Sequence, residues 1–230
     1  MTGSAKTGPA GDADSPKAVR EPAHQQVYRQ LRDLILFGEM APGQAVTIQG
    51  LVAQLGAGMT PVREAIRRLT AEGALEFQGN RRVSVPMLTV ENISELIFAR
   101  QAIEPQLTVR ATERATAADI DELTEIDALL DEAIDSGDVR AYLEQNYRFH
   151  SKLYAIAESP ILSDLSDSLW LRYGPSLRVV CGRLGTQNLP DQHKETLIAM
   201  RAGDTEAAAR AIREDVIQGM EQMRHALLAA

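Results

Sequence analysis

The segment LGAGMTPVREAIRRL, residues 55–69, concentrates positive charge in a chain that is acidic as a whole. Three arginines, Arg63, Arg67 and Arg68, lie within six positions, and Glu64 is the only acidic residue of the segment. The full chain of 230 residues has 24 basic and 32 acidic side chains, which gives a formal net charge of −8. A local excess of arginine in such a chain indicates contact with an anionic partner.

The same segment is predicted to form a helix with one apolar face and one basic face. Thr60 and Pro61 indicate its start, because a hydroxyl can cap the first turn and proline suits the first helical position. Arg63 and Arg67 are four residues apart and share one face. Another face is formed by apolar residues spaced four and three apart: Val62, Ile66 and Leu69.

Charge divides the chain into two parts. Residues 1–87 carry a formal charge of +2, and residues 88–230 carry −10. Residues 1–22 lack an apolar period and are predicted to be a disordered tail, which leaves 23–87 as the first domain. No apolar run approaches the roughly 18 residues of a membrane span, and the single cysteine, Cys181, excludes an internal disulfide. We expect a cytoplasmic protein without membrane contact.

The first domain is predicted to contain two helices before the basic helix and a small hairpin after it. Thr47 precedes the second of these helices. Gly79 and Asn80 separate two short apolar stretches, as in a hairpin turn. Helices followed by a hairpin form a winged helix-turn-helix, and Arg81 and Arg82 would lie at the tip of its wing.

Residues 88–230 are predicted to be entirely helical. Thr89 can cap a helix that runs to about residue 115, and Thr116 with Asp119 forms a capping box for the next helix. The fold class is therefore mainly α, with an N-terminal winged helix-turn-helix and a C-terminal helical bundle. The remaining helices are expected at about 138–157, 161–182, 190–202 and 205–228.

One pair of side chains in the second part is spaced to share a metal ion. Asn146 and His150 are four residues apart, which places both on one face of a helix. From the spacing alone, the alternative is a pair of polar core residues bonded to each other. The two hypotheses remain open at this level.

Several segments resemble a family of bacterial transcription regulators. TPVREAIRRLTAEGALE, residues 60–76, is similar to the recognition helix of the GntR family, and VYRQLRDLILFGEMAPGQAV resembles its first helix and turn. LTVENISELIFARQAIEP and NYRFHSKLY resemble the FCD effector domain of the FadR subfamily. The resemblance covers about residues 24–228. It implies a homodimer that binds operator DNA, with effector binding and dimerisation in residues 88–230.

The resemblance also implies DNA contacts. A recognition helix enters the major groove, where an arginine can bind guanine or phosphate. The alternative is a solvated helix face on which Arg67 pairs with Glu64 or Glu72. Two residues depart from the family pattern: Met59 stands where an arginine is frequent, and Arg82 where the wing often has glycine. The implied DNA contacts are Thr60, Arg63, Arg67, Arg68, Arg81 and Arg82.

A metal site is implied by the same resemblance. Asn146, His150 and His193 match three ligand positions of the FCD domain, and Asp215 stands at the fourth, where histidine is typical. The cofactor would be a divalent ion, Zn²⁺, Ni²⁺ or Mn²⁺. Oxygen ligands shift the preference toward harder ions.

Arg100 matches a recurrent FCD arginine that would hold a small carboxylate effector, although pairing with Glu104 is the alternative. The leading hypothesis is a ligand-responsive repressor rather than an enzyme. An interaction module built on the acidic helices is another hypothesis. A further alternative is a metal-dependent enzyme with a general base at Glu144 or Glu214 and ligands His150, His193 and Asp215.

Overall fold

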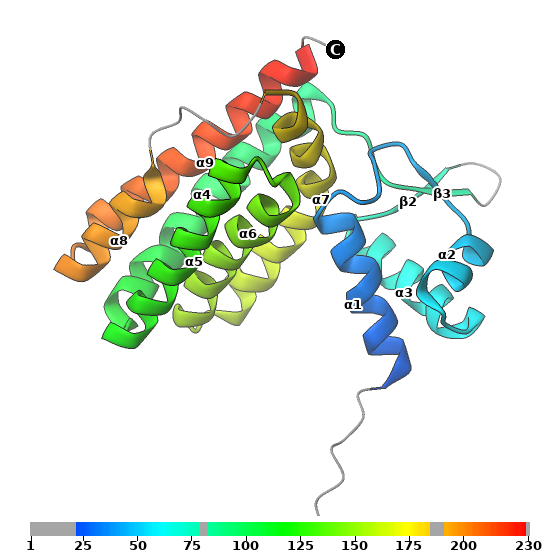
Figure 1. Cartoon of the computed structure of the whole chain (residues 1–230), viewed down its shortest axis with the longest axis horizontal. Coiled ribbons are helices and arrows are strands. Elements are labelled where there is room, and N and C mark those ends of the chain that lie inside the picture. The colour runs from blue at the N-terminus through cyan, green and yellow to red at the C-terminus, as the bar shows by residue number, and fades with distance from the viewer. Residues whose placement is uncertain (1–21, 79–81, 185–190, 229–230) are drawn as a thin grey trace, which may run out of the picture.

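The computed structural model describes residues 22–78, 82–184 and 191–228. Within these ranges a small domain of helices and strands lies beside a bundle of long helices (Figure 1). The predicted fold class, mainly α with two such parts, is confirmed. No described helix is both long enough and apolar enough to cross a lipid bilayer.

The described part of the first domain combines three helices with a three-stranded antiparallel sheet in the order β1-β3-β2. The arms of the predicted hairpin are β2 and β3, which pair Phe77 with Val83. Strand β1 was not predicted, because a strand of two residues is too short to show an alternation of apolar and polar side chains. The predicted turn at Gly79 and Asn80 lies outside the described residues. The elements are α1 (Ala23–Leu36), β1 (Ala45–Val46), α2 (Ile48–Leu55), α3 (Met59–Ala71), β2 (Glu76–Gln78) and β3 (Arg82–Ser84).

The helix starts of the first domain follow local capping chemistry. Thr47 caps α2, because its hydroxyl accepts a hydrogen bond from the Gly50 amide at 3.0 Å. The predicted cap at Thr60 is wrong: α3 begins at Met59 and its N-cap is Gly58, without a side-chain bond. Pro61 fits inside the first turn, since the amides there have no partner within the helix.

The bundle follows the predicted helices closely. Thr89 and Thr116 both form capping boxes, with Asn92 and Asp119 as their partners. The predicted start at Thr116 and Asp119 is therefore confirmed. The helices are α4 (Val90–Arg114), α5 (Ala117–Ser136), α6 (Val139–Ile156), α7 (Pro160–Leu184), α8 (Gln192–Ala202) and α9 (Thr205–Leu228).

Helix α1 connects the two parts. It packs on α3 within the first domain and on α7 of the bundle, and Figure 1 shows it at the side of the bundle where α7 lies. In the bundle, α4 packs along α9, α5 along α6, and α8 along α9. One cluster of buried apolar side chains, which includes Leu31 and Leu69 as well as Phe149 and Ile212, runs through both parts.

Candidate DNA-binding face and metal centre

Helix α3 presents an exposed basic face to solvent. Thr60, Arg63 and Arg67 are exposed on one side of the helix, since residues three and four apart share a face. The arginines are therefore not enclosed in the described structure. The opposite side is buried against α1 and α2 and consists of Val62, Ala65, Ile66 and Leu69.

Arg67 and Arg63 differ in their partners. Arg67 Nη2 lies 2.9 Å from Glu64 Oε2, and 80% of the Arg67 side chain is exposed. The alternative pairing considered from the sequence is therefore present. An exposed pair of this kind contributes only about 0–1 kcal/mol, so it leaves Arg67 able to bind phosphate. Arg63 makes no hydrogen bond or ion pair with any other described residue.

Arg68 is held at the flank of the same helix. Its Nε donates to Glu72 Oε1 at 2.9 Å, and its guanidinium lies 3.7 Å from the centre of the Tyr28 ring. The Tyr28 hydroxyl donates to the other oxygen of Glu72 at 2.7 Å. Burial and the neighbouring Glu72 raise the pKa of Tyr28 to about 12, so it stays a donor. These contacts orient Arg68 before any partner binds.

The wing carries one of the residues predicted to contact DNA. Arg82 begins β3, is exposed, and lies opposite Gln78 in the hairpin. Arg81 falls outside the described residues. Together with α3, the exposed arginines form a cationic surface on the first domain, which contrasts with the acidic bundle.

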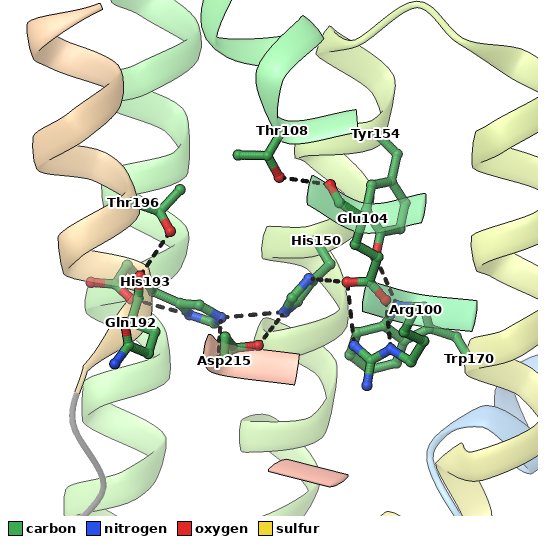
Figure 2. A network of polar contacts seen from close by, with 11 residues as sticks. Arg100, Glu104, Thr108, His150, Tyr154, Trp170, Gln192, His193, Thr196 and Asp215 are labelled. Carbon is green, nitrogen blue, oxygen red and sulfur yellow. Dashed lines mark hydrogen bonds and ion pairs between the residues drawn. The ribbon is translucent and has the colours of Figure 1, made fainter. Parts of the chain in front are cut away.

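A polar cluster lies inside the bundle, where residues from three helices converge. His150 of α6 and His193 of α8 face each other through their Nε2 atoms, 3.4 Å apart. Asp215 of α9 approaches both, at 3.2 Å from His150 Nε2 and 3.8 Å from His193 Nε2. Figure 2 shows the two rings pointing toward each other with Asp215 beside them. The structure therefore brings together three of the four predicted metal ligands.

Behind each histidine stands a second carboxylate. His150 Nδ1 lies 3.1 Å from Glu104 Oε2, and His193 Nδ1 lies 3.5 Å from Asp127 Oδ1. A carboxylate on the far side of a ring is the usual support of a metal-bound histidine. Asp127 was missed by the sequence analysis, although its acidic side chain on the buried face of a predicted helix was a usable signal. The donor set therefore fits a divalent cation.

Electrostatics keep the carboxylates of the cluster charged. Burial opposes ionisation of Glu104, yet Arg100 and His150 hold its pKa at about 2. Burial likewise opposes ionisation of Asp215, but its contact with His150 lowers its pKa to about 2. Burial alone would lower the pKa of His150, but bonds to Asp215 and Glu104 raise it to about 9. The cluster therefore attracts positive charge.

Arg100 forms the pair that the sequence offered as an alternative. Its Nε and Nη2 both bond to Glu104, and both side chains are buried. The guanidinium also packs over the rings of Trp170 and Tyr173, at 4.9 and 4.4 Å from their centres. Arg100 thus connects the polar cluster to the rings of Trp170 and Tyr173.

A cavity of about 60 Å³ opens beside the cluster. Arg100, Asn146 and Asp215 all line it, so the fourth predicted ligand shares the cavity with Asp215. Tyr173 also lines it, and its buried hydroxyl has no hydrogen-bond partner among the described residues. Cys181 lines it as a buried thiol, and burial raises its pKa to about 12. The cavity therefore combines cation ligands with an unsatisfied donor.

The proposed bases of the enzyme alternative lie away from this cavity. Glu144 is bound by Arg140 on its own helix, and Glu214 is exposed on α9. Neither residue lines the cavity. Successive helical residues point about 100° apart, which explains why a neighbour of a ligand does not face the same site.

A winged helix-turn-helix with an exposed arginine face, joined to a bundle with an internal polar cavity, defines a DNA-binding regulatory protein. Residues 23–85 match the gntR family of bacterial regulatory proteins, and residues 95–217 match the FCD domain. The chain therefore belongs to the GntR family of bacterial transcription regulators and carries an FCD domain.

Relatives agree with this assignment. The chain is 29% identical over 199 residues to the HTH-type transcriptional regulator McbR of Escherichia coli, covering 85% of this chain and 90% of McbR. The solved structure of E. coli McbR/YncC superimposes with a TM-score of 0.82 at 27% identity, over 88% of this chain and 97% of that one. The chain is 26% identical to a protein of Paenarthrobacter nicotinovorans named "Probable D-xylose utilization operon transcriptional repressor", covering 93% and 94% of the two chains. The names of the E. coli and P. nicotinovorans relatives describe regulators of transcription.

Proposed function

We propose that this regulator is a repressor that binds operator DNA as a homodimer in the bacterial cytoplasm and is controlled by a small carboxylate bound beside a metal ion. The observation that carries the proposal is the exposed cationic face of α3, opposite a face buried in the winged helix-turn-helix. The named D-xylose repressor among its relatives supports the repressor role.

Recognition of bases is assigned to Arg63. It is exposed and makes no bond to another described residue, so its guanidinium is available to donate two hydrogen bonds to a guanine. Arg67 and Arg68 already have acidic partners, so they are assigned to phosphate contacts and not to base contacts. Arg82 lies on the wing and is also assigned to a phosphate contact. Thr60, one turn before Arg63 and two turns before Arg67, completes the contact face.

A homodimer would place two α3 helices in successive major grooves, about 34 Å apart. The bundle offers apolar surface for such an assembly. Phe98 on α4 and Ile161 on α7 are 78% and 76% exposed, which is unusual for side chains of this size. Light scattering of the purified protein tests the stoichiometry.

The metal ion is assigned to His150, His193 and Asp215, with Asn146 as the fourth ligand. The three close donors and the carboxylates behind both histidines support this assignment. Zn²⁺, Ni²⁺ and Mn²⁺ all accept such mixed nitrogen and oxygen ligands. A bound divalent ion supplies positive charge and open coordination positions for a carboxylate.

The effector is assigned to the cavity beside the metal ligands. Arg100 and the unpartnered hydroxyl of Tyr173 both line that cavity and could bind a carboxylate. The present volume of about 60 Å³ is far below the roughly 300 Å³ of a small-molecule pocket, so an effector of several carbons must displace the walls. Effector binding would therefore move the helices that line the cavity.

The direct test is operator binding by Arg63→Ala. Duplexes selected from random-sequence DNA provide the operator, and a gel-shift titration measures the affinity. We expect a loss of about 1–3 kcal/mol of binding free energy and weaker discrimination between sequences. Arg213→Ala, an exposed arginine of α9, is the matched control. Unchanged affinity and selectivity in Arg63→Ala would remove the assigned role of α3.

A further inference from the structure

Helix α7 contacts both the cavity and the DNA-binding domain. One face lines the cavity beside the polar cluster, and residues beside and behind that face contact the DNA-binding domain. The cavity face consists of residues spaced three and four apart, Trp170, Tyr173, Leu177 and Cys181. Asp167, Gly174 and Arg178, which flank the cavity face, touch α1 and the turn after it. Ser168 and Arg172, on the far side of the helix, touch the end of α3. One helix, with Pro175 inside it, therefore reaches from the candidate ligand site to the recognition domain.

Gly174 forms a tight backbone contact at the centre of this interface. A Cβ atom placed on Gly174 would lie 2.3 Å from the carbonyl oxygen of Leu36, the last residue of α1. This approach leaves no room for a side chain, so α7 and α1 touch directly through backbone. The two helices cannot separate here without loss of packing.

A polar contact lies to one side of the Gly174 contact. The Tyr147 hydroxyl of α6 accepts a hydrogen bond from Arg32 Nη2 of α1 at 2.7 Å and donates one to Asp167 Oδ1 of α7 at 3.0 Å. Arg32 itself lies 3.8 Å from Asp167, and only 15% of its side chain is exposed. One hydroxyl therefore joins three helices from the two parts of the molecule.

The same tyrosine touches the candidate ligand site. The ring of Tyr147 meets Trp170 edge-on, with ring centres 5.4 Å apart, and Trp170 lies 5.1 Å from the His150 ring. Tyr147 also follows Asn146 directly in α6. Any movement of Trp170 or of α6 that enlarges the cavity must therefore displace Tyr147.

Helix α7 also contacts the end of the recognition helix. The Ser168 hydroxyl donates to the carbonyl oxygen of Glu72, the C-cap of α3, at 3.4 Å. The guanidinium of Arg172 packs against Gly73, the next residue. A cation at a helix C-terminus interacts favourably with the helix dipole. The orientation of α3 thus depends on where α7 lies.

We propose that Tyr147, Asp167 and Arg32 form a coupling contact, through which occupancy of the cavity beside α7 changes the orientation of α1 and α3. These are positioning residues, which act on DNA affinity without touching DNA. The inference rests on the proposed function, because it needs a protein that binds operator DNA. In this proposal the contact has two states: the hydroxyl either bridges Arg32 and Asp167 or gives up one of them.

The single tryptophan provides the readout. By reciprocity, a coupling that transmits ligand binding to DNA must also transmit DNA binding to the ligand site. Adding a selected operator duplex to the wild-type protein should therefore change the emission of Trp170, without any metal or effector present. Tyr147→Phe keeps the ring contacts and removes the hydroxyl, and Asp167→Asn removes the charge that meets Arg32.

Operator titrations of both variants, followed by gel shift and by Trp170 emission, test the inference. We expect each variant to bind the operator while its emission change falls to less than about half of the wild-type change. In the same variants, the effect of Ni²⁺ on operator affinity should drop to below about twofold, against a coupling of at least about fivefold in the wild type. Asp164→Asn, the same substitution one turn earlier at an exposed position of α7, is the matched control and should behave as wild type.

The outcomes separate the two proposals. A wild-type protein that binds no selected duplex contradicts the proposed DNA-binding function. A wild-type protein that binds duplex with unchanged Trp170 emission overturns the coupling contact alone. The coupling contact is also overturned if wild type, Tyr147→Phe and Asp167→Asn show equal changes in emission. It is overturned as well if Asp164→Asn loses as much of the emission change as these two variants do.

Discussion

His150 and His193 meet through their Nε2 atoms, 3.4 Å apart, although they lie 43 positions apart in the chain. Each ring turns its other nitrogen toward a buried carboxylate, Glu104 behind His150 and Asp127 behind His193. Two histidines that share a carboxylate in front and have one behind each ring support the proposed metal site.

Asp127→Asn should weaken metal binding although Asp127 is not a proposed ligand. Loss of the carboxylate behind a ligating histidine typically lowers metal affinity about 10–100-fold, because the ring orientation and basicity both change. Calorimetric titration with Zn²⁺ and Ni²⁺ measures the effect. Asp121→Asn, at an exposed position of the same helix, is the control and should bind metal as wild type does. Equal affinity in the two variants would argue against the metal site.

Tyr173→Phe should reduce effector binding while leaving metal binding intact. The hydroxyl is buried without a described partner, and an unsatisfied buried donor costs about 1–3 kcal/mol. The variant should therefore be at least as stable as wild type in the absence of ligand. A thermal-shift screen of small carboxylic acids should give smaller shifts for the variant, because bound ligand stabilises by mass action. A carboxylic acid that shifts both proteins equally would show that this hydroxyl does not contact it.

Gly174→Ala should destabilise the contact between α1 and α7. The added methyl group would lie 2.3 Å from the Leu36 carbonyl oxygen, so the helices must separate, and overpacking of this kind costs about 1–3 kcal/mol. Gly219→Ala is the matched control in α9, where a Cβ meets no atom within 4 Å. That variant should gain about 0.4–1 kcal/mol, because alanine lowers the entropy of the unfolded chain. Urea unfolding measures the free energy of unfolding of both variants. A change of the same sign in the two variants would contradict the close approach of α1 and α7.

Arg82→Ala should weaken operator binding equally for all sequences and reduce its salt dependence. A phosphate contact releases about one counterion, so the slope of log affinity against log salt should become less negative by about 1. Gel shifts over a range of KCl concentrations measure the slope. Arg213→Ala on α9 is the control. A change in sequence preference without a change in slope would instead place Arg82 on a base edge.

Helix positions and the basic face could be predicted because both depend on neighbours in sequence. Capping boxes at Thr89 and Thr116 involve residues three positions apart, and the apolar face of α3 repeats every three to four residues. The start of α3 was mispredicted at Thr60, since glycine and threonine serve about equally well as N-caps and the pattern favours neither. Asn146 and His150 were visible as a pair for the same local reason.

The sequence by itself therefore determined the order of the helices, the winged helix-turn-helix and the amphipathic recognition helix, because these follow from periodicity and capping along a short stretch of chain. Only the tertiary structure decided that His193 and Asp215 reach His150, that Asp127 supports His193, and that Gly174 lies against Leu36. Such contacts join residues tens of positions apart. They are set by the way whole helices pack, which no local pattern encodes.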